Sequence, residues 1–129
     1  MKRDMDLIRE LLLKLESLPM RMGGIVVITP DAEEVQVEGY GVEQIDYHLS
    51  LIREAGMVDI GGVRPMVGIG FRRLSWTGHE FLDSVRSPEV WARTKAGALA
   101  AGGFTVQLLA DLAKGFIKKQ IEDRTGVKL

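Results

Sequence analysis

The sequence predicts an α+β fold in which helices combine with a small antiparallel hairpin and two additional C-terminal helices. Three observations support this class. Apolar residues recur at helical spacing, short β-branched runs alternate with turn residues, and capping residues mark where helices begin and end. The chain has 129 residues, of which 46% are hydrophobic and 27% are charged. This length and composition indicate one globular domain of ordinary size.

The first third of the chain predicts one helix and two strands. Asp4 can cap a helix over residues 5–18, where apolar residues share one face, and Pro19 ends it. Residues 25–28 and 34–38 are rich in valine and isoleucine and are bracketed by glycine and proline turns, so we expect two short strands.

The middle of the chain predicts a helix followed by a hairpin. The helix begins near Val42 and ends where Gly56 supplies a left-handed residue after the last turn. Two extended segments, 57–60 and 67–74, flank a glycine-containing tip at 61–65. We expect them to pair as a hairpin, which we call the wing.

A capping box is the strongest local signal in the chain. Thr77 and Glu80 have the spacing in which a hydroxyl and a carboxylate each accept an otherwise unpaired backbone amide, and Trp76 can pack on Phe81 as a hydrophobic staple. We therefore expect a helix from Thr77 to Arg86, with Trp76 as a core anchor.

Two helices are expected in the remaining residues. Ser87 caps the first, which has Pro88 in its opening turn and ends at 102–103. The second spans about 105–125, and Gly126 ends it.

The final helix has an apolar face wider than a helix on a single domain needs. Its apolar positions sweep an arc of about 220°, whereas a helix on a single domain needs little more than about 100°. The preceding helix, with Val90, Trp91 and Leu99, can cover the excess, and so can the same helix of a second chain. We expect a two-fold homodimer with this helix in its interface.

The order helix, strands, helix, hairpin, helix is the layout of a winged-helix domain. We therefore expect a winged-helix-like core over residues 1–86 and a C-terminal helical extension over residues 87–129. Residues 42–86 resemble bacterial winged-helix regulators, because Leu-Ser-Leu-Ile-Arg-Glu-Ala-Gly-Met-Val precedes the wing and Leu-Ser-Trp-Thr-Gly follows it. An ordinary helix-turn-helix has a helix directly before the recognition helix, whereas residues 25–40 here predict strands.

A second resemblance covers nearly the whole chain. Residues 2–9, 47–56 and 74–86, followed by Val90 and Trp91, resemble an uncharacterised family of small bacterial and prophage proteins, a domain of unknown function. The resemblance implies a bacterial or phage origin and a winged-helix-like core. It transfers no catalytic residue.

Charge patterning bears on nucleic-acid binding. The formal net charge is −1, and residues 31–73 contain eight acidic and four basic residues, although phosphate binding needs clustered lysine and arginine. Arg64 at the wing tip and Arg72 and Arg73 at its base are the candidate contacts to double-stranded DNA. The alternative is that these arginines are solvated strand residues.

Candidates for catalysis are few. Cysteine is absent, which excludes thiol chemistry and cysteine-based metal sites. His79 and Asp83 lie one helical turn apart, but two ligands make no metal site. His48 lies beside the apolar stripe of its helix and is expected to hydrogen bond to backbone. We expect no catalytic residue, no metal, no cofactor and no enzymatic activity, and we interpret the methionines as core filler.

These observations favour a non-enzymatic winged-helix binding module of bacterial or prophage origin that takes part in DNA-associated regulation. The alternative is a protein–protein interaction adaptor, for example a phage protein that acts on a host protein. The acidic face of the second helix favours the alternative. No apolar run reaches the roughly 20 residues that span a bilayer, so we expect a cytoplasmic protein without membrane contact.

Overall fold

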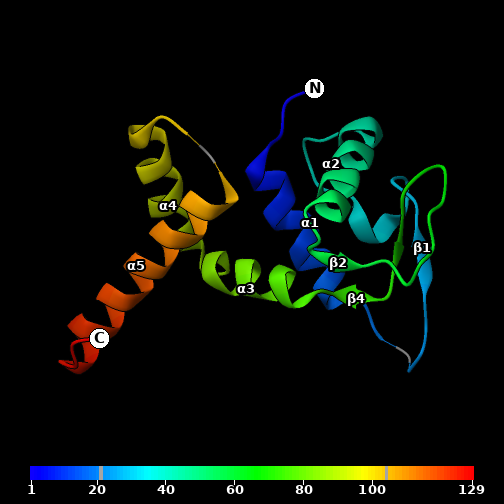
Figure 1. The fold of residues 1–129 in the computed structure, drawn as a ribbon. Helices are drawn as coiled ribbons and strands as arrows, with labels where there is room; N and C mark the ends of the chain where they lie inside the picture. The colour runs from blue at the N-terminus through cyan, green and yellow to red at the C-terminus, as the bar shows by residue number, and fades with distance from the viewer. Residues whose placement is uncertain (21, 104) are drawn as a thin grey trace. The chain divides into compact units, whose positions relative to one another are not determined.

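The computed structural model describes residues 1–20, 22–103 and 105–129. The described chain is α+β, with five α-helices and two small antiparallel sheets (Figure 1). This confirms the predicted class and is compatible with a winged-helix-like domain followed by C-terminal helices. The chain forms two compact units, Met1–His79 and Glu80–Leu129. The predicted division at residues 86 and 87 stays a prediction.

Two helices contribute much of the core of the first unit. Both begin where the sequence predicts, and α1 ends one residue before its predicted end. α1 spans Met5–Ser17, and the Asp4 side chain accepts a hydrogen bond from the Leu7 amide at 3.2 Å. α2 spans Val42–Glu54 and is followed by Gly56, whose φ of 69° is the left-handed conformation that suits glycine. The apolar stripes of both helices are buried: Leu7, Leu11, Leu12 and Leu15 from α1, and Ile45, Leu49 and Ile52 from α2.

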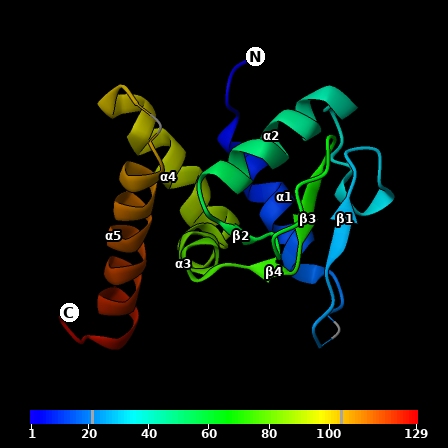
Figure 2. The same ribbon diagram turned by 45° about the vertical axis from the view of Figure 1, so that its right-hand side comes forward.

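The strands pair in an order that the sequence does not reveal. β1 (Val26–Ile28) pairs antiparallel with β3 (Ile69–Phe71), and β2 (Val58–Asp59) pairs antiparallel with β4 (Arg73–Leu74). β3 and β4 follow each other along one extended segment, which changes partner at Arg72 (Figure 2). There the Arg72 amide donates to the carbonyl oxygen of Asp59 at 2.8 Å.

The predicted strand at 34–38 is wrong. Glu33–Val35 form a short 3₁₀ turn, η1, in which Val35 is buried. The side chain of Gln36 donates to the carbonyl oxygens of Pro30 and Ala32, both at 2.9 Å. These local hydrogen bonds close a turn instead of leaving the backbone open for a ladder. η1 lies before α2, where an ordinary helix-turn-helix has a helix.

The predicted start of the next helix is also wrong, by one residue. α3 spans Trp76–Val85, and its cap is Ser75, whose hydroxyl accepts from the Gly78 amide at 3.0 Å. Thr77 and Glu80 lie within the helix and do not form the capping box. Ser75 takes this position because its amide also donates to the Met57 carbonyl at 2.9 Å, which continues the β2–β4 pairing.

The hydrophobic staple predicted beside that box is absent. Trp76 is 82% exposed, whereas Phe81 is buried. With the helix beginning at Trp76, this side chain lies on the first turn and points to solvent rather than into the core.

The second unit contains the two predicted helices. α4 spans Pro88–Ala101 and α5 spans Val106–Thr125, and the two lie side by side (Figure 1 and Figure 2). Ser87 and Thr105 accept from the amides three residues on, and left-handed Gly102 and Gly126 end the helices.

Candidate functional site

The three candidate DNA-binding arginines lie on or beside the wing, and one carboxylate holds two of them. Arg64 is exposed in the loop between β2 and β3. The Asp59 Oδ2 atom lies 3.6 Å from Arg72 Nη1 and 3.8 Å from Arg73 Nε. The other oxygen of Asp59 accepts from the Gly61 amide at 2.9 Å. The structure thus brings Arg72 and Arg73 together around Asp59, which partly neutralises their charge.

The helix that a winged-helix protein would place in the DNA groove presents acids to solvent. Glu43 and Glu54 on α2 are exposed. Asp46 has a structural task, because its Oδ1 atom accepts from the Gly68 amide at 3.1 Å and holds the approach to β3 against α2. Such a face repels phosphate, so α2 is poorly suited to enter a DNA groove.

Exposed apolar side chains gather around β1. Val26 and Val27 are 51% and 49% exposed. We call the following residues the β1 patch: Met20, Met22, Ile25, Val26 and Val27, all exposed. Met66 and Val67 in the wing loop are exposed as well. Exposed apolar residues that gather in this way are typical of protein-binding surfaces.

A groove adjoins the β1 patch. Its volume is about 460 Å³, within the range of ligand and side-chain pockets, and its walls are largely apolar. The residues that line it are Leu18, Pro19, Met20, Gly24, Ile25, Val26, Phe71 and Arg72. A neighbouring hollow of about 370 Å³ is lined by Met20, Met22, Gly23, Arg72 and Arg73.

Arg72 is the charged residue shared by the groove and the hollow. Its Nε atom is buried and has no hydrogen-bond partner within the described chain. A buried donor without an acceptor is costly. The walls of the groove are largely apolar, and Arg72 supplies a positive charge at one side.

A polar cluster joins the start of α1 to α2. The Asp4 amide donates to His48 Nε2 at 2.8 Å, and the Tyr40 hydroxyl donates to Asp4 Oδ2 at 2.8 Å. His48 Nδ1 lies 2.7 Å from the carbonyl oxygen of Gln44, so this nitrogen carries the proton and Nε2 is the acceptor. Both ring nitrogens of the buried His48 are thus engaged by backbone, which confirms the predicted structural role.

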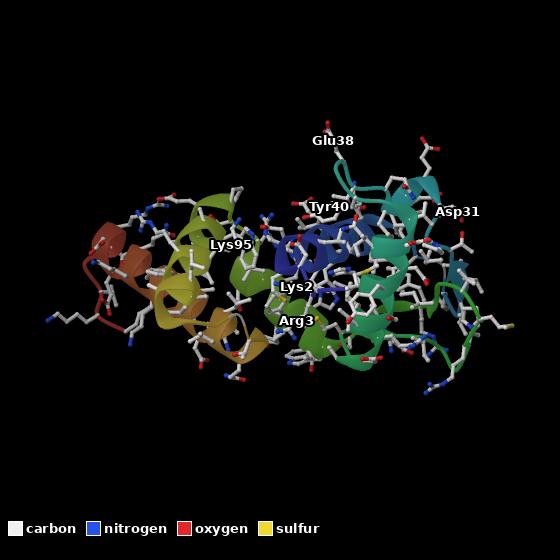
Figure 3. The ribbon with its side chains drawn as sticks, turned by 90° about the horizontal axis from the view of Figure 1, so that it is seen from above. Lys2, Arg3, Asp31, Glu38, Tyr40 and Lys95 are labelled. Atoms are coloured by element: carbon white, nitrogen blue, oxygen red, sulfur yellow. The ribbon has the colours of Figure 1, made fainter. Side chains whose placement is uncertain are left out.

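Burial, followed by the hydrogen bond to Asp4, raises the pKa of Tyr40 to about 12. Negative charge on Asp4, Asp6 and Glu10 adds to the rise. Figure 3 shows Tyr40 in the first unit. Its hydroxyl is a hydrogen-bond donor to Asp4, the residue that caps α1.

His79 and Asp83 each lie near another charged side chain. His79 Nδ1 lies 3.7 Å from Glu16 Oε2, and Asp83 Oδ1 lies 2.7 Å from Arg86 Nη2. No group of three metal-ligating side chains occurs within residues 1–20, 22–103 and 105–129.

In the same residues no helix has the length and apolarity needed to cross a bilayer.

Sequence reasoning missed the β1 patch and the groove. The interpretation of the methionines as core filler is wrong for Met20, Met22 and Met66, all exposed. Their positions among glycines and prolines, outside any periodic segment, were the available signal. Methionine is flexible and polarisable, and it suits surfaces that adapt to a partner.

Comparisons with known proteins identify the family of the chain. A family model described as "Hypothetical protein (DUF2513)" matches residues 2–104. An "Uncharacterized protein" of Haemophilus influenzae is 39% identical over 98 residues, which cover 74% of this chain and 76% of that protein. No solved structure matches the chain.

Proposed function

The chain belongs to the DUF2513 family of hypothetical proteins and has a bacterial relative. We propose that it is a non-enzymatic binding module whose β1 patch and groove bind another protein. The observation that carries the proposal is the exposure of Val26 and Val27 beside a largely apolar groove. Burial of apolar surface is the main driving force of protein association.

The contacts of four ionisable residues favour a binding role over catalysis. His48 is buried and held by backbone on both ring nitrogens. His79 lies beside Glu16, and Asp46 and Asp59 each accept a backbone amide. These groups organise the fold rather than face a common cavity.

Affinity capture with matched variants tests the proposal. The tagged chain is used as bait in a bacterial lysate, and captured proteins are quantified by mass spectrometry. Val27→Asp places a charge in the β1 patch and should release the specific partner. Leu99→Asp places the same charge at an exposed apolar side chain of α4, outside the β1 patch, and should retain it. Identical capture by wild type and Val27→Asp would contradict the proposal.

Double-stranded DNA is a second candidate partner, favoured by the exposure of Arg64 and Arg73. In this case the wing holds the phosphates. The combined variant Arg64→Ala, Arg72→Ala and Arg73→Ala should abolish binding to a mixed duplex at low ionic strength. Asp59→Asn should tighten it by removing the carboxylate that neutralises the arginines.

The acids of α2 provide the control for that candidate. Glu43→Ala and Glu54→Ala should leave DNA binding equal or make it tighter, because they remove repulsion and no contact. Absence of any salt-sensitive binding to duplex would eliminate the DNA candidate.

We also propose that the protein is a homodimer through α5, acts in the cytoplasm and originates from a prophage. Support for the dimer comes from apolar side chains that α4 leaves unburied. Leu108, Leu112 and Phe116 are only half-buried, and Ile121 is 41% exposed. A second copy of α5 would cover them.

A further inference from the structure

β1 is an edge strand with one open side. β3 lies along one side of β1, and no strand of the described chain lies along the other (Figure 2). Edge strands commonly carry charges or proline that discourage pairing with another chain. β1 consists of Val-Val-Ile and carries neither. Its open side is therefore a template for an added strand.

The backbone of Val27 faces this open side. A Cβ atom at Gly68 would collide with the carbonyl oxygen of Ile28, which places that oxygen on the β3 side. Ile28 is the register partner of Ile69, and hydrogen-bonded pairs alternate along an antiparallel ladder. The N–H and C=O of Val27 consequently point away from β3, and no hydrogen bond from outside the β1–β3 pair reaches them among the described residues.

Charge differs between the two ends of β1. Arg72 and Arg73 lie by the groove at its start, since Phe71 is the register partner of Val26. Acids follow its end: Asp31, Glu33 and Glu34, all exposed. Figure 3 labels Asp31 among these. The C-terminal end of an antiparallel added strand would lie at the same end of β1 as these arginines.

We infer that β1 accepts an extended segment of a partner protein as an added antiparallel strand, with an apolar side chain in the groove and a carboxylate beside Arg72. The inference rests on the proposed function and specifies its partner. Main-chain hydrogen bonds to Val27 would supply affinity, while the groove and Arg72 would select the sequence. The incoming carboxylate would pair with the exposed part of the Arg72 guanidinium, whose side chain is partly open to solvent.

A second copy of β1 fits less well than a foreign segment. In an antiparallel pairing of two β1 strands, the residues that follow Ile28 would lie by the groove of the other copy. These are Thr29, Pro30 and Asp31, which include no large apolar side chain to fill it. Pro30 also lacks the N–H that would extend the ladder.

Selection from a display library of random peptides of about eight residues tests the inference with the full chain as target. Enriched peptides should alternate apolar residues and carry a carboxylate in their C-terminal half. Val27→Pro removes the outward N–H without touching a β1–β3 hydrogen bond, and it should weaken an enriched peptide by about tenfold. Arg72→Gln should weaken it similarly, and Leu99→Ala should not.

Several results would overturn strand addition. The first is a selection that enriches no peptide. The second is a set of enriched peptides that bind Val27→Pro and wild type equally. The third is a wild-type dimer that Val27→Pro alone dissociates, which would show that a second copy of the chain occupies β1. If the library fails while Val27→Asp still releases a captured protein, the proposed function stands without this mode of binding. If wild type and Val27→Asp also capture the same proteins, both the proposed function and strand addition are contradicted.

Discussion

Replacement of Ser75 provides the sharpest test of how the wing connects to α3. Its hydroxyl accepts from the Gly78 amide at 3.0 Å and donates to the Gly56 carbonyl at 2.5 Å. Loss of a serine cap costs about 1 kcal/mol. The Gly56 hydrogen bond is exposed to water, so its loss adds only about 0.5 kcal/mol. Ser75→Ala should therefore lower the free energy of unfolding by about 1.5 kcal/mol.

Urea unfolding at equilibrium measures this difference, and three further variants separate its parts. Ser75→Thr keeps both hydrogen bonds and should be nearly neutral. Ser75→Asp keeps the acceptor for Gly78 but has no hydroxyl proton for Gly56, so it should fall between wild type and Ser75→Ala. Thr77→Ala should change stability by less than about 0.5 kcal/mol. If Thr77→Ala costs as much as Ser75→Ala, the helix begins where the sequence predicted and our assignment of the cap is refuted.

Three further predictions concern the polar cluster and the association state. The raised pKa of Tyr40 means that the folded chain holds the phenol proton more tightly than the unfolded chain. The stability that this provides is complete below pH 10 and is lost as pH rises to about 12. Ultraviolet titration should show a late tyrosine transition that Tyr40→Phe removes and Tyr47→Phe retains. His48→Phe should cost about 1 to 3 kcal/mol in urea unfolding, because the Asp4 amide loses its acceptor, and an unchanged midpoint would contradict this role. Light scattering of the wild type should give twice the 14.3 kDa mass of the chain. Ile121→Asp should halve the measured mass. A wild-type monomer at micromolar concentration would exclude the dimer.

Most helix boundaries could be predicted because their signals are local. Asp4, Ser87 and Thr105 each cap the helix that follows, and Gly56 and Gly102 take the left-handed conformation at helix ends. Each signal depends on residues within one turn, so no tertiary information is needed.

The errors arose where distant segments decide between local alternatives. Ser75 and Thr77 both carry a capping hydroxyl, and the choice depends on hydrogen bonds from Ser75 to Gly56 and Met57. Residues 34–38 have strand-like composition but no strand to pair with, and Gln36 closes a turn instead.

The candidate site could be predicted only in part. Charge and position indicate Arg64, Arg72 and Arg73 as candidates. The carboxylate that joins two of them, however, comes from β2 across the β2–β4 pairing. The groove combines the segment after α1 with the start of β1 and the end of β3. Periodicity cannot reveal such a surface, because it depends on which strands pair.

The central claim is that the β1 patch is the surface at which a protein partner binds. Amide hydrogen exchange of the full chain, with and without the captured partner, tests it most directly. We predict that exchange slows at residues 24–28, most strongly at Val27, while amides of α5 keep their rates. Protection confined to α2 or to the loop around Arg64, with residues 24–28 unchanged, would contradict the claim.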